Sequence, residues 1–294
     1  MTSAVARRQP AYYDDQDLNY QDYWTSRNYE HDAELMAVRR LLRGRTFEHA
    51  VDIGGGYGRL SVVLADFAGR VTLADSSKQQ LDLAGRFLRG HPRITPRLMD
   101  AAALQIEDES ADLAGLIRVL HHLPDPAAEL RELCRILRPG GYALIEVANL
   151  AHARNRVRYP LRGRPVPLSA VDLRAPALKA RGGIPFVNHH PATIIGQLQA
   201  TGLSLEQMLS VSNLRHRALK RWLPPRMLLA VERALQERLA PVYFGPSMFL
   251  LLRKGPKADW ESPGRFSGRG AGVTAARGSL PARRAGPAPP VPSP

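Results

Sequence analysis

Residues 49–60, HAVDIGGGYGRL, place a carboxylate and a glycine cluster directly behind an apolar run. The residues of interest are Asp52, Gly54, Gly55, Gly56 and Gly58. Glycines in such a turn let backbone N–H groups approach a bound ligand closely. Dinucleotide-binding turns use G-x-G-x-x-G to seat a pyrophosphate, whereas here the third glycine is out of place and the carboxylate would repel that group. The pattern favours a nucleotide-like ligand with an ammonium or sulfonium; the alternative is a packing turn.

A second acidic residue follows the next apolar segment. Asp75 ends the run 70–74, roughly twenty residues after the glycines, where a carboxylate can accept hydrogen bonds from ribose hydroxyls. Ser76 or Ser77 is expected to cap the helix that comes next. This spacing indicates an adenosine-type ligand, and the alternative role for Asp75 is a turn or helix cap.

Alternating apolar runs and breakers predict a doubly wound α/β sheet with its ligand crevice at the carboxyl end of the first strand. Strands are expected to end near residue 53 and to span 70–74, 94–99, 111–119, 142–148, 203–211 and 243–254. Helices are expected to begin near residues 59 and 78 and to span 126–137 and 191–201, with a helical insertion over 214–239.

These motifs, with LHHLPDP at 120–126 and RPGG at 138–141, resemble the class I S-adenosylmethionine (SAM) dependent methyltransferases, in particular the bacterial small-molecule group of methyltransferase type 11. The resemblance is strong over about residues 45–150 and loose over 185–255. It implies a Rossmann-like, seven-stranded, mostly parallel sheet with an antiparallel last strand and helices on both faces. It also implies SAM as cofactor and transfer of its methyl group to an O, N or C nucleophile, releasing S-adenosylhomocysteine.

The resemblance assigns cofactor roles residue by residue. Asp52 and the glycines would lie beneath the methionine part of SAM, and Asp75 would hold the ribose. Asp100, after the third strand, would receive the adenine amino group, with Ala101 offering a backbone N–H; a turn cap is the alternative for Asp100. The full expected cofactor set is Asp52, Gly54, Gly55, Gly56, Gly58, Asp75, Ser76, Asp100, Ala101 and Arg118.

Arg118 departs from the family pattern, which usually has a small, polar or apolar residue near the end of the fourth strand. An arginine there would either bind an acidic substrate or the SAM carboxylate, or pair structurally with Asp100 or Asp112. Both interpretations stay open.

Two pairs of adjacent histidines are candidates for proton transfer, because histidine titrates near neutral pH. We expect His121 to face the site as the catalytic residue and His122 to pack under the following helix. His189 and His190 are expected at the rim of the same pocket as substrate contacts. No metal is expected, since adjacent histidines point apart and no cysteine or carboxylate stands beside them at ligand spacing.

An aromatic and acidic segment precedes the first strand. Tyr13, Tyr23 and Trp24 are expected to contact substrate from a lid that ends in a helix, the alternative being a segment packed on the back of the sheet. The predicted organisation is an arm and lid helix (1–44), a SAM-binding half (45–149), a substrate-side loop, helical insertion and last strands of the same domain (150–255), and a disordered tail (256–294).

The 294 residues carry a formal net charge of +14, with the excess in the middle loop, the insertion and the tail. A basic amphipathic helix in the insertion can lie on an anionic membrane or pack on its own domain, and membrane or lipid contact is not expected. The sequence contains no recognisable RNA-binding module, so nucleic acid is not expected as a partner either. The predicted function is methyl transfer to a small molecule; the alternatives are an RNA or anionic-lipid acceptor, or a non-catalytic SAM-binding protein.

The compartment is inferred from cysteine use and hydropathy. A single cysteine, Cys134, excludes an intramolecular disulfide, and there is no signal peptide and no apolar run of eighteen residues. We expect a cytoplasmic protein; its acceptor molecule and oligomeric state stay open.

Overall fold

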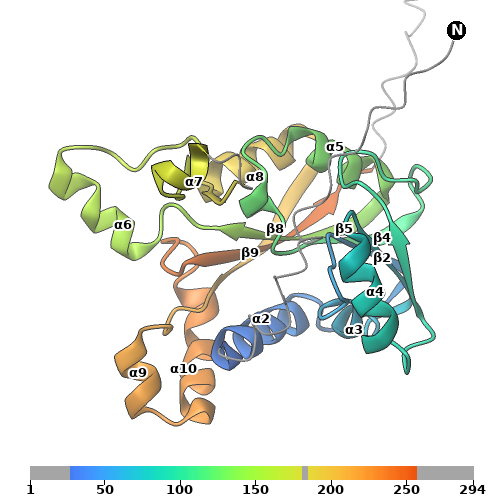
Figure 1. Ribbon diagram of the computed structural model, residues 1–294, viewed down its shortest axis with the longest axis horizontal. Coiled ribbons are helices and arrows are strands. Elements are labelled where there is room, and N and C mark those ends of the chain that lie inside the picture. The colour runs from blue at the N-terminus through green and yellow to red at the C-terminus, as the bar shows by residue number, and fades with distance from the viewer. Residues whose placement is uncertain (1–26, 181–184, 257–294) are drawn as a thin grey trace, which may run out of the picture. The chain divides into compact units, whose positions relative to one another are not determined.

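The computed structural model describes residues 27–180 and 185–256, which form a seven-stranded sheet with helices on both faces (Figure 1). The strand order is β3-β2-β1-β4-β5-β9-β8. Strands β3 to β5 are parallel, and β9 is antiparallel to both of its neighbours. The predicted fold, including the antiparallel last strand, is confirmed. The strands are β1 Phe47–Ile53, β2 Ala68–Asp75, β3 Ile94–Leu98, β4 Ala111–Leu116, β5 Leu137–Ala148, β8 Leu203–Val211 and β9 Ser247–Lys254.

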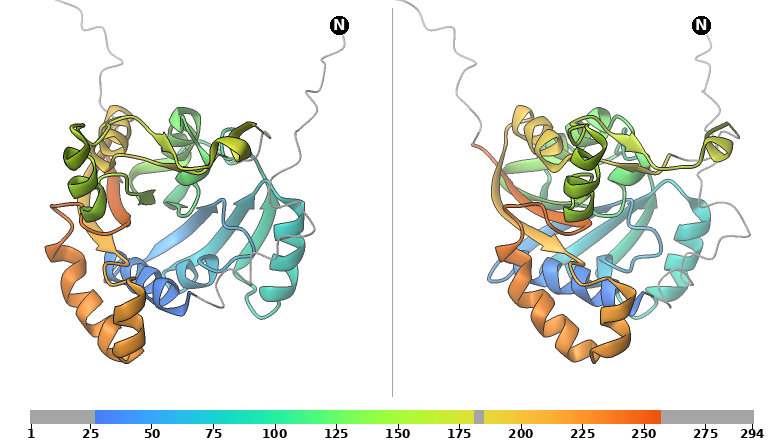
Figure 2. Two further views of the ribbon diagram at one scale, coloured as in Figure 1. Left: turned by 60° about the vertical axis from the view of Figure 1, so that its left-hand side comes forward. Right: turned by 90° about the vertical axis from the view of Figure 1, so that its left-hand side faces the viewer.

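Helices cover the sheet in two layers, which Figure 2 shows from two sides. One layer contains α2 (Asn28–Leu41), α3 (Ser61–Leu64), α4 (Lys78–Phe87) and α10 (Pro225–Arg238), and the other contains α5 (Ala127–Ile136) and α8 (Pro191–Ala200). The short elements are η2 Leu120–His122, α6 Ala153–Arg158, η3 Pro160–Arg162, β6 Val171–Asp172, α7 Pro176–Ala180, β7 Val187–Asn188 and α9 Arg217–Trp222.

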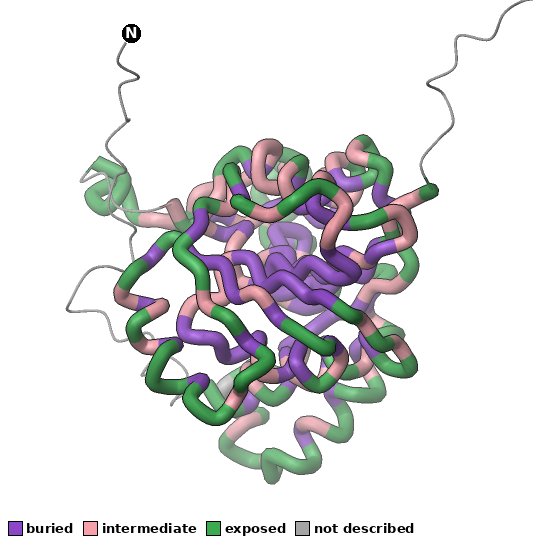
Figure 3. Tube along the Cα trace, turned by 90° about the vertical axis from the view of Figure 1, so that its right-hand side faces the viewer, coloured by how far each residue is buried: buried purple, intermediate pink, exposed green. Residues whose placement is uncertain are grey.

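The core lies on both sides of the central strands, whose residues are buried along most of their length (Figure 3). Successive side chains of a strand point to opposite faces. In β1, Val51 and Ile53 therefore join the cluster under α5 and α8, whereas Ala50 joins the cluster under α2 and α3. Continuous apolar runs suit such strands, because both faces are covered.

Several predicted boundaries differ from the structure. Strand β4 ends at Leu116 rather than near 119, because Arg118 adopts a left-handed backbone conformation with φ 65°. Strand β5 starts at Leu137, since Leu137 pairs with Ala111 of β4 and an irregularity separates this pair from the next one, Tyr142 with Leu113. The predicted substrate-side loop, which was expected from residue 150 onward, contains α6, η3, β6 and α7. The predicted insertion forms two helices, with a break before α10, whose N-cap is Pro224 and whose first residue is Pro225.

Two predicted segments lie wholly or partly outside the described residues. Of the predicted lid, α2 is described, while Tyr13, Tyr23 and Trp24 fall within residues 1–26. The predicted tail falls almost entirely within residues 257–294.

Candidate active site

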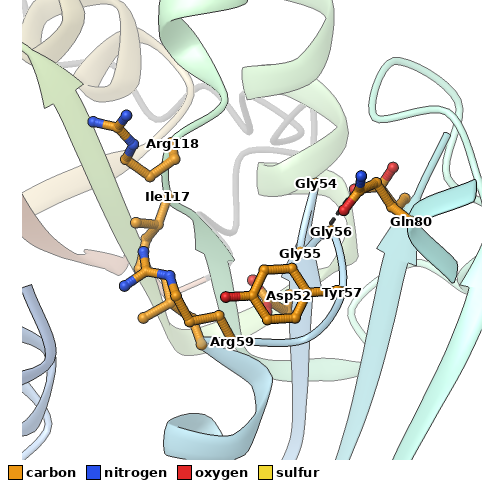
Figure 4. Close-up of a pocket in the computed structure, with 11 residues that line it drawn as sticks. Asp52, Gly54, Gly55, Gly56, Tyr57, Arg59, Gln80, Ile117 and Arg118 are labelled. Carbon is orange, nitrogen blue, oxygen red and sulfur yellow. Dashed lines mark hydrogen bonds between the residues drawn. The ribbon is translucent and has the colours of Figure 1, made fainter. Parts of the chain in front are cut away.

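The carboxyl ends of β1, β2 and β4 meet at one edge of the sheet because these strands are parallel neighbours. A cavity at this edge, here called the glycine-loop cavity, contains most of the predicted cofactor residues. Figure 4 shows Ile117 and Arg118 on one side of it and Gln80 on the other, with the glycine turn between them. Its described lining is Asp52, Gly54, Gly55, Gly56, Tyr57, Arg59, Leu60, Asp75, Gln80, Ile117 and Arg118.

The glycine turn needs its glycines for different reasons. Gly54 and Gly56 have φ angles of 69° and 58°, which L side chains rarely adopt. A Cβ atom at Gly55 would lie 2.7 Å from Oδ2 of Asp52. Gly58, with φ 95°, faces Leu88 and is not among the residues that line the cavity, so it shapes the turn into α3.

Asp75 connects the turn to the following helix. Its Oδ2 accepts a hydrogen bond from the backbone N–H of Gly56, and its Oδ1 accepts one from the backbone N–H of Ser77, both at 2.8 Å. Ser77, not Ser76, caps α4, and Ser76 is exposed outside the cavity lining. The carboxylate of Asp75 is therefore held in place at the cavity wall.

Asp52 lies in the floor of the cavity with 1% of its surface exposed. Its Oδ2 accepts a hydrogen bond from the hydroxyl of Ser61 at 2.6 Å. Burial raises the pKa of Asp52 to about 6, against an ordinary value of 3.8. A nearby cation would favour the charged carboxylate, so this position suits a positively charged ligand group.

Arg59 connects the glycine turn to α2. The sequence analysis did not identify it as a site residue. Its guanidinium forms a buried ion pair with Glu34 at 2.6 Å and contacts Nδ1 of His31 at 2.9 Å. A basic residue at the start of an otherwise apolar helix was the only signal in the sequence, and its partner lies 25 residues earlier. The sequence pattern does not show that pairing.

A second cavity, here called the Glu146 cavity, lies between α2 and the substrate-side segment and shares Arg118 with the first. Glu146, in β5, is 1% exposed; its carboxylate accepts hydrogen bonds from the hydroxyl of Ser247 and, at 3.3 Å, from the backbone N–H of Arg118. Burial raises its pKa, and the charge of Arg118 partly offsets that effect. The rest of the described lining is Arg27, Glu30, Glu34, Ala148, His152, Leu173, Phe186, Asn188, Ser212, Arg215, Pro246 and Ser247.

The predicted structural pairing of Arg118 with Asp112 is wrong. Asp112 lies near the start of β4 and Arg118 beyond its end, so the two are separated by the length of that strand. Asp112 instead pairs with Arg138 at 2.6 Å and accepts the backbone N–H groups of Glu48 and His49. Arg118 lies where both cavities meet, facing Glu146.

The structure does not place either residue of the first histidine pair in the described lining of the two cavities. His121 is the more buried, 4% exposed, and is not among the described residues that line either cavity. Burial lowers its pKa well below the usual range, and the positive charge of Arg118 adds to this. His122 is less buried and contacts the carbonyl of Pro185 at 3.2 Å. Both rings pack near Phe186.

The second histidine pair supports the backbone. His189 is 4% exposed, and its Nε2 contacts the carbonyl of Leu120 at 3.0 Å. It therefore supports η2 and does not lie at the rim of a cavity. His190 caps α8 by accepting the backbone N–H of Ala192 at 3.3 Å. Neither belongs to the described lining of the two cavities.

Asp100 follows β3 and is exposed, and its Oδ1 accepts the backbone N–H of Ala102 at 2.9 Å. Ala101 packs partly against the core. These contacts are typical of a turn. The role of Asp100 at the adenine, which its place just after β3 suggests, stays a prediction. Within the described part of the chain, no three histidine, cysteine or acidic side chains gather as a metal site, and no helix is long and apolar enough to cross a bilayer.

The glycine-loop cavity fits SAM by the chemistry of its groups. It offers a backbone turn without side chains, a fixed carboxylate in Asp75 for a ribose, and a buried carboxylate in Asp52 for a cationic group. Residues 51–145 match the family model described as a methyltransferase domain. Residues 51–145 of the chain therefore carry a methyltransferase domain.

Individual relatives agree over the same part of the chain. A 37.1 kDa protein of transposon Tn4556 from Streptomyces fradiae is 41% identical over 103 residues, which are 34% of this chain and 30% of the relative. The demethylmenaquinone methyltransferase of Clavibacter sepedonicus is 34% identical over 110 residues, 37% of this chain and 45% of the relative. The chain thus matches less than half the length of either.

The fold similarity extends further than the sequence similarity. A SAM-dependent methyltransferase structure from Mesorhizobium loti covers 76% of this chain and 98% of its own, with a TM-score of 0.52 and 22% identity. At that identity the similarity concerns the fold.

Proposed function

We propose that this chain is a methyltransferase that binds SAM in the glycine-loop cavity and a small-molecule acceptor in the Glu146 cavity. The observation that carries the proposal is the position of Arg118, which lines both cavities. A donor and an acceptor bound there would meet at the end of β4. Holding the two reactants in contact supplies most of what methyl transfer requires of a protein.

Bound SAM supplies an electrophilic methyl group and retains the electron pair of the broken carbon–sulfur bond as S-adenosylhomocysteine. The residues of this chain bind and orient the reactants. Asp75 and the glycine turn hold the nucleoside of SAM, and Asp52 faces the positively charged part of SAM. Glu146 takes the proton that a hydroxyl or amine acceptor loses as its lone pair forms the new bond to carbon.

We assign this proton to Glu146 in preference to His121. Glu146 lines the acceptor cavity, and burial raises its pKa toward neutrality, which improves a carboxylate as a base. His121, the candidate from the sequence, is outside the described lining of both cavities, and its lowered pKa makes it a weak base. A small-molecule acceptor is supported by the relative named as a demethylmenaquinone methyltransferase.

The test is calorimetric titration of ligand-free protein with SAM and S-adenosylhomocysteine, with NAD as control. Binding of both sulfur compounds and not of NAD supports the cofactor assignment, and absence of binding overturns it. Labelled SAM is then incubated with metabolite extract and, separately, with RNA. Transfer to RNA alone would overturn the small-molecule acceptor, and SAM binding without any transfer would indicate a non-catalytic protein.

The variant Glu146→Gln separates catalysis from cofactor binding. We expect it to bind SAM as the natural protein does and to transfer label at least a hundredfold more slowly. His121→Gln is the comparison and should retain most activity. The reverse ranking would return the catalytic role to His121.

A further inference from the structure

Exposed apolar side chains gather with arginines on the segment formed by α6 and η3. Val157 and Leu161 are 63% and 81% exposed. They share one surface hollow with Arg154, Arg158 and Arg162. These five residues are here called the α6 patch.

The apolar surface continues beyond the α6 patch onto the loop before β9. The backbone N–H of Ala153 donates to the carbonyl of Phe244 at 2.9 Å, and Arg156 donates to the carbonyl of Val242 at 2.6 Å. Val242 and Phe244 are themselves 45% and 39% exposed. Two chain segments far apart in sequence are thus joined by hydrogen bonds, and each of them carries exposed apolar side chains.

The charge around the α6 patch has one sign. Residues 149–181 contain eight lysines or arginines and one acidic residue, Asp172. That carboxylate is already bound by Arg174 at 2.7 Å. The patch therefore presents a positive charge together with aliphatic surface.

We propose that the α6 patch docks on an anionic lipid surface. Aliphatic side chains at such a surface enter the boundary between headgroups and acyl chains, and guanidinium groups pair with lipid phosphates. An anionic lipid surface therefore accommodates both the aliphatic and the basic side chains of the patch. An RNA would engage the arginines but would leave Val157 and Leu161 in water, because unpaired bases bind proteins by stacking on aromatic rings.

The position of the α6 patch connects docking to the Glu146 cavity. His152 lines that cavity and is the N-cap of α6, so the patch begins directly beside the cavity wall. Docking does not depend on methyl transfer. It holds the proposed acceptor cavity next to lipid, where an amphiphilic acceptor would be concentrated.

The test is co-sedimentation of the full chain with phosphatidylcholine vesicles, with and without phosphatidylglycerol. We expect binding only to the anionic vesicles, and weaker binding at high salt. Leu161→Asp should weaken binding about tenfold or more, and Arg162→Gln roughly fivefold. The matched controls are Leu98→Asp and Arg97→Gln in β3, where both side chains are also exposed, and these should bind as the natural protein does.

Other results would overturn the proposal. Equal losses in the patch and control variants would mean a nonspecific charge effect. Loss in Trp222→Ala but not in Leu161→Asp would assign the contact to α9, whose Trp222 is 78% exposed. Patch-dependent binding to RNA with none to vesicles would replace the lipid by nucleic acid. SAM titration of each variant, measured separately, distinguishes these outcomes from failure of the methyltransferase assignment.

Discussion

The carboxylate of Asp75 holds the backbone N–H of Gly56 at 2.8 Å, so the residue expected to bind the ribose also shapes the glycine turn. The same carboxylate accepts the N–H of Ser77 at the start of α4. One side chain thus orders two elements of the cofactor cavity. A substitution there removes a ligand contact and a backbone support together.

Asp75→Ala should weaken SAM binding by at least tenfold, since hydrogen bonds to a charged group contribute about 1.5–3 kcal/mol. Calorimetry measures the effect, and circular dichroism checks that the sheet is intact. Asp82→Ala is the control, because Asp82 lies on α4 in an exposed ion pair with Lys78. Equal affinity in both variants would remove Asp75 from the cofactor site.

The raised pKa of Asp52 predicts that SAM affinity depends on pH. Its charged form attracts a cation and predominates above about pH 6. The affinity for SAM should therefore fall as the pH drops below about 6, approaching tenfold per pH unit, and the dependence should disappear in Asp52→Asn. Titrations from pH 5 to 8 test this, and a flat profile in the natural protein would contradict it.

The same residue predicts an opposite effect on the stability of the ligand-free protein. A carboxylate whose pKa is raised on folding contributes most below its unfolded value of about 3.8, and that contribution is lost as the pH rises through about 6. Asp52→Asn should therefore raise the free energy of unfolding at pH 7.5, by up to about 3 kcal/mol. Urea unfolding at pH 7.5 and at pH 4 compares the two proteins, and the gain should vanish at pH 4.

The buried pair of Arg59 and Glu34 predicts a large loss of stability when one partner is removed. Glu34→Gln leaves a guanidinium in a site where only 8% of its side chain is exposed, which should cost about 3–5 kcal/mol. Asp66→Asn is the control, since the pair of Arg39 and Asp66 is about half exposed and should contribute less than about 1 kcal/mol. Denaturant unfolding of the two variants distinguishes a structural pair from a surface one.

The fold and the cofactor edge could be predicted because local patterns determine them. Apolar runs, breakers and the spacing from Gly56 to Asp75 are all contained in short windows of sequence. Pairing across the chain was not visible in this way. Arg59 with Glu34, and Glu146 between Arg118 and Ser247, join residues 25 to 101 positions apart. Glu146 also lies inside an apolar strand. From the sequence alone, a single acidic residue at that place looks the same as a charged residue at the end of a strand.

The histidines show a second limit of sequence reasoning. Their chemistry suits catalysis, but burial decides whether that chemistry is available. His121 and His189 are buried at η2, where one packs against Phe186 and the other holds the carbonyl of Leu120. Residue type alone could not separate these supporting roles from catalytic ones.

Arg118 combines a left-handed backbone, φ 65°, with a side chain at the junction of the two cavities. Such a conformation costs a non-glycine residue about 1–2 kcal/mol, and glycine adopts it without that cost. Arg118→Gly should therefore be more stable than Arg118→Ala by about 1 kcal/mol, although both lose the charge facing Glu146. Unfolding free energies of the two variants test the backbone term alone, because their side chains differ by one methyl group. If alanine is the more stable of the two, the strain at Arg118 is absent in solution.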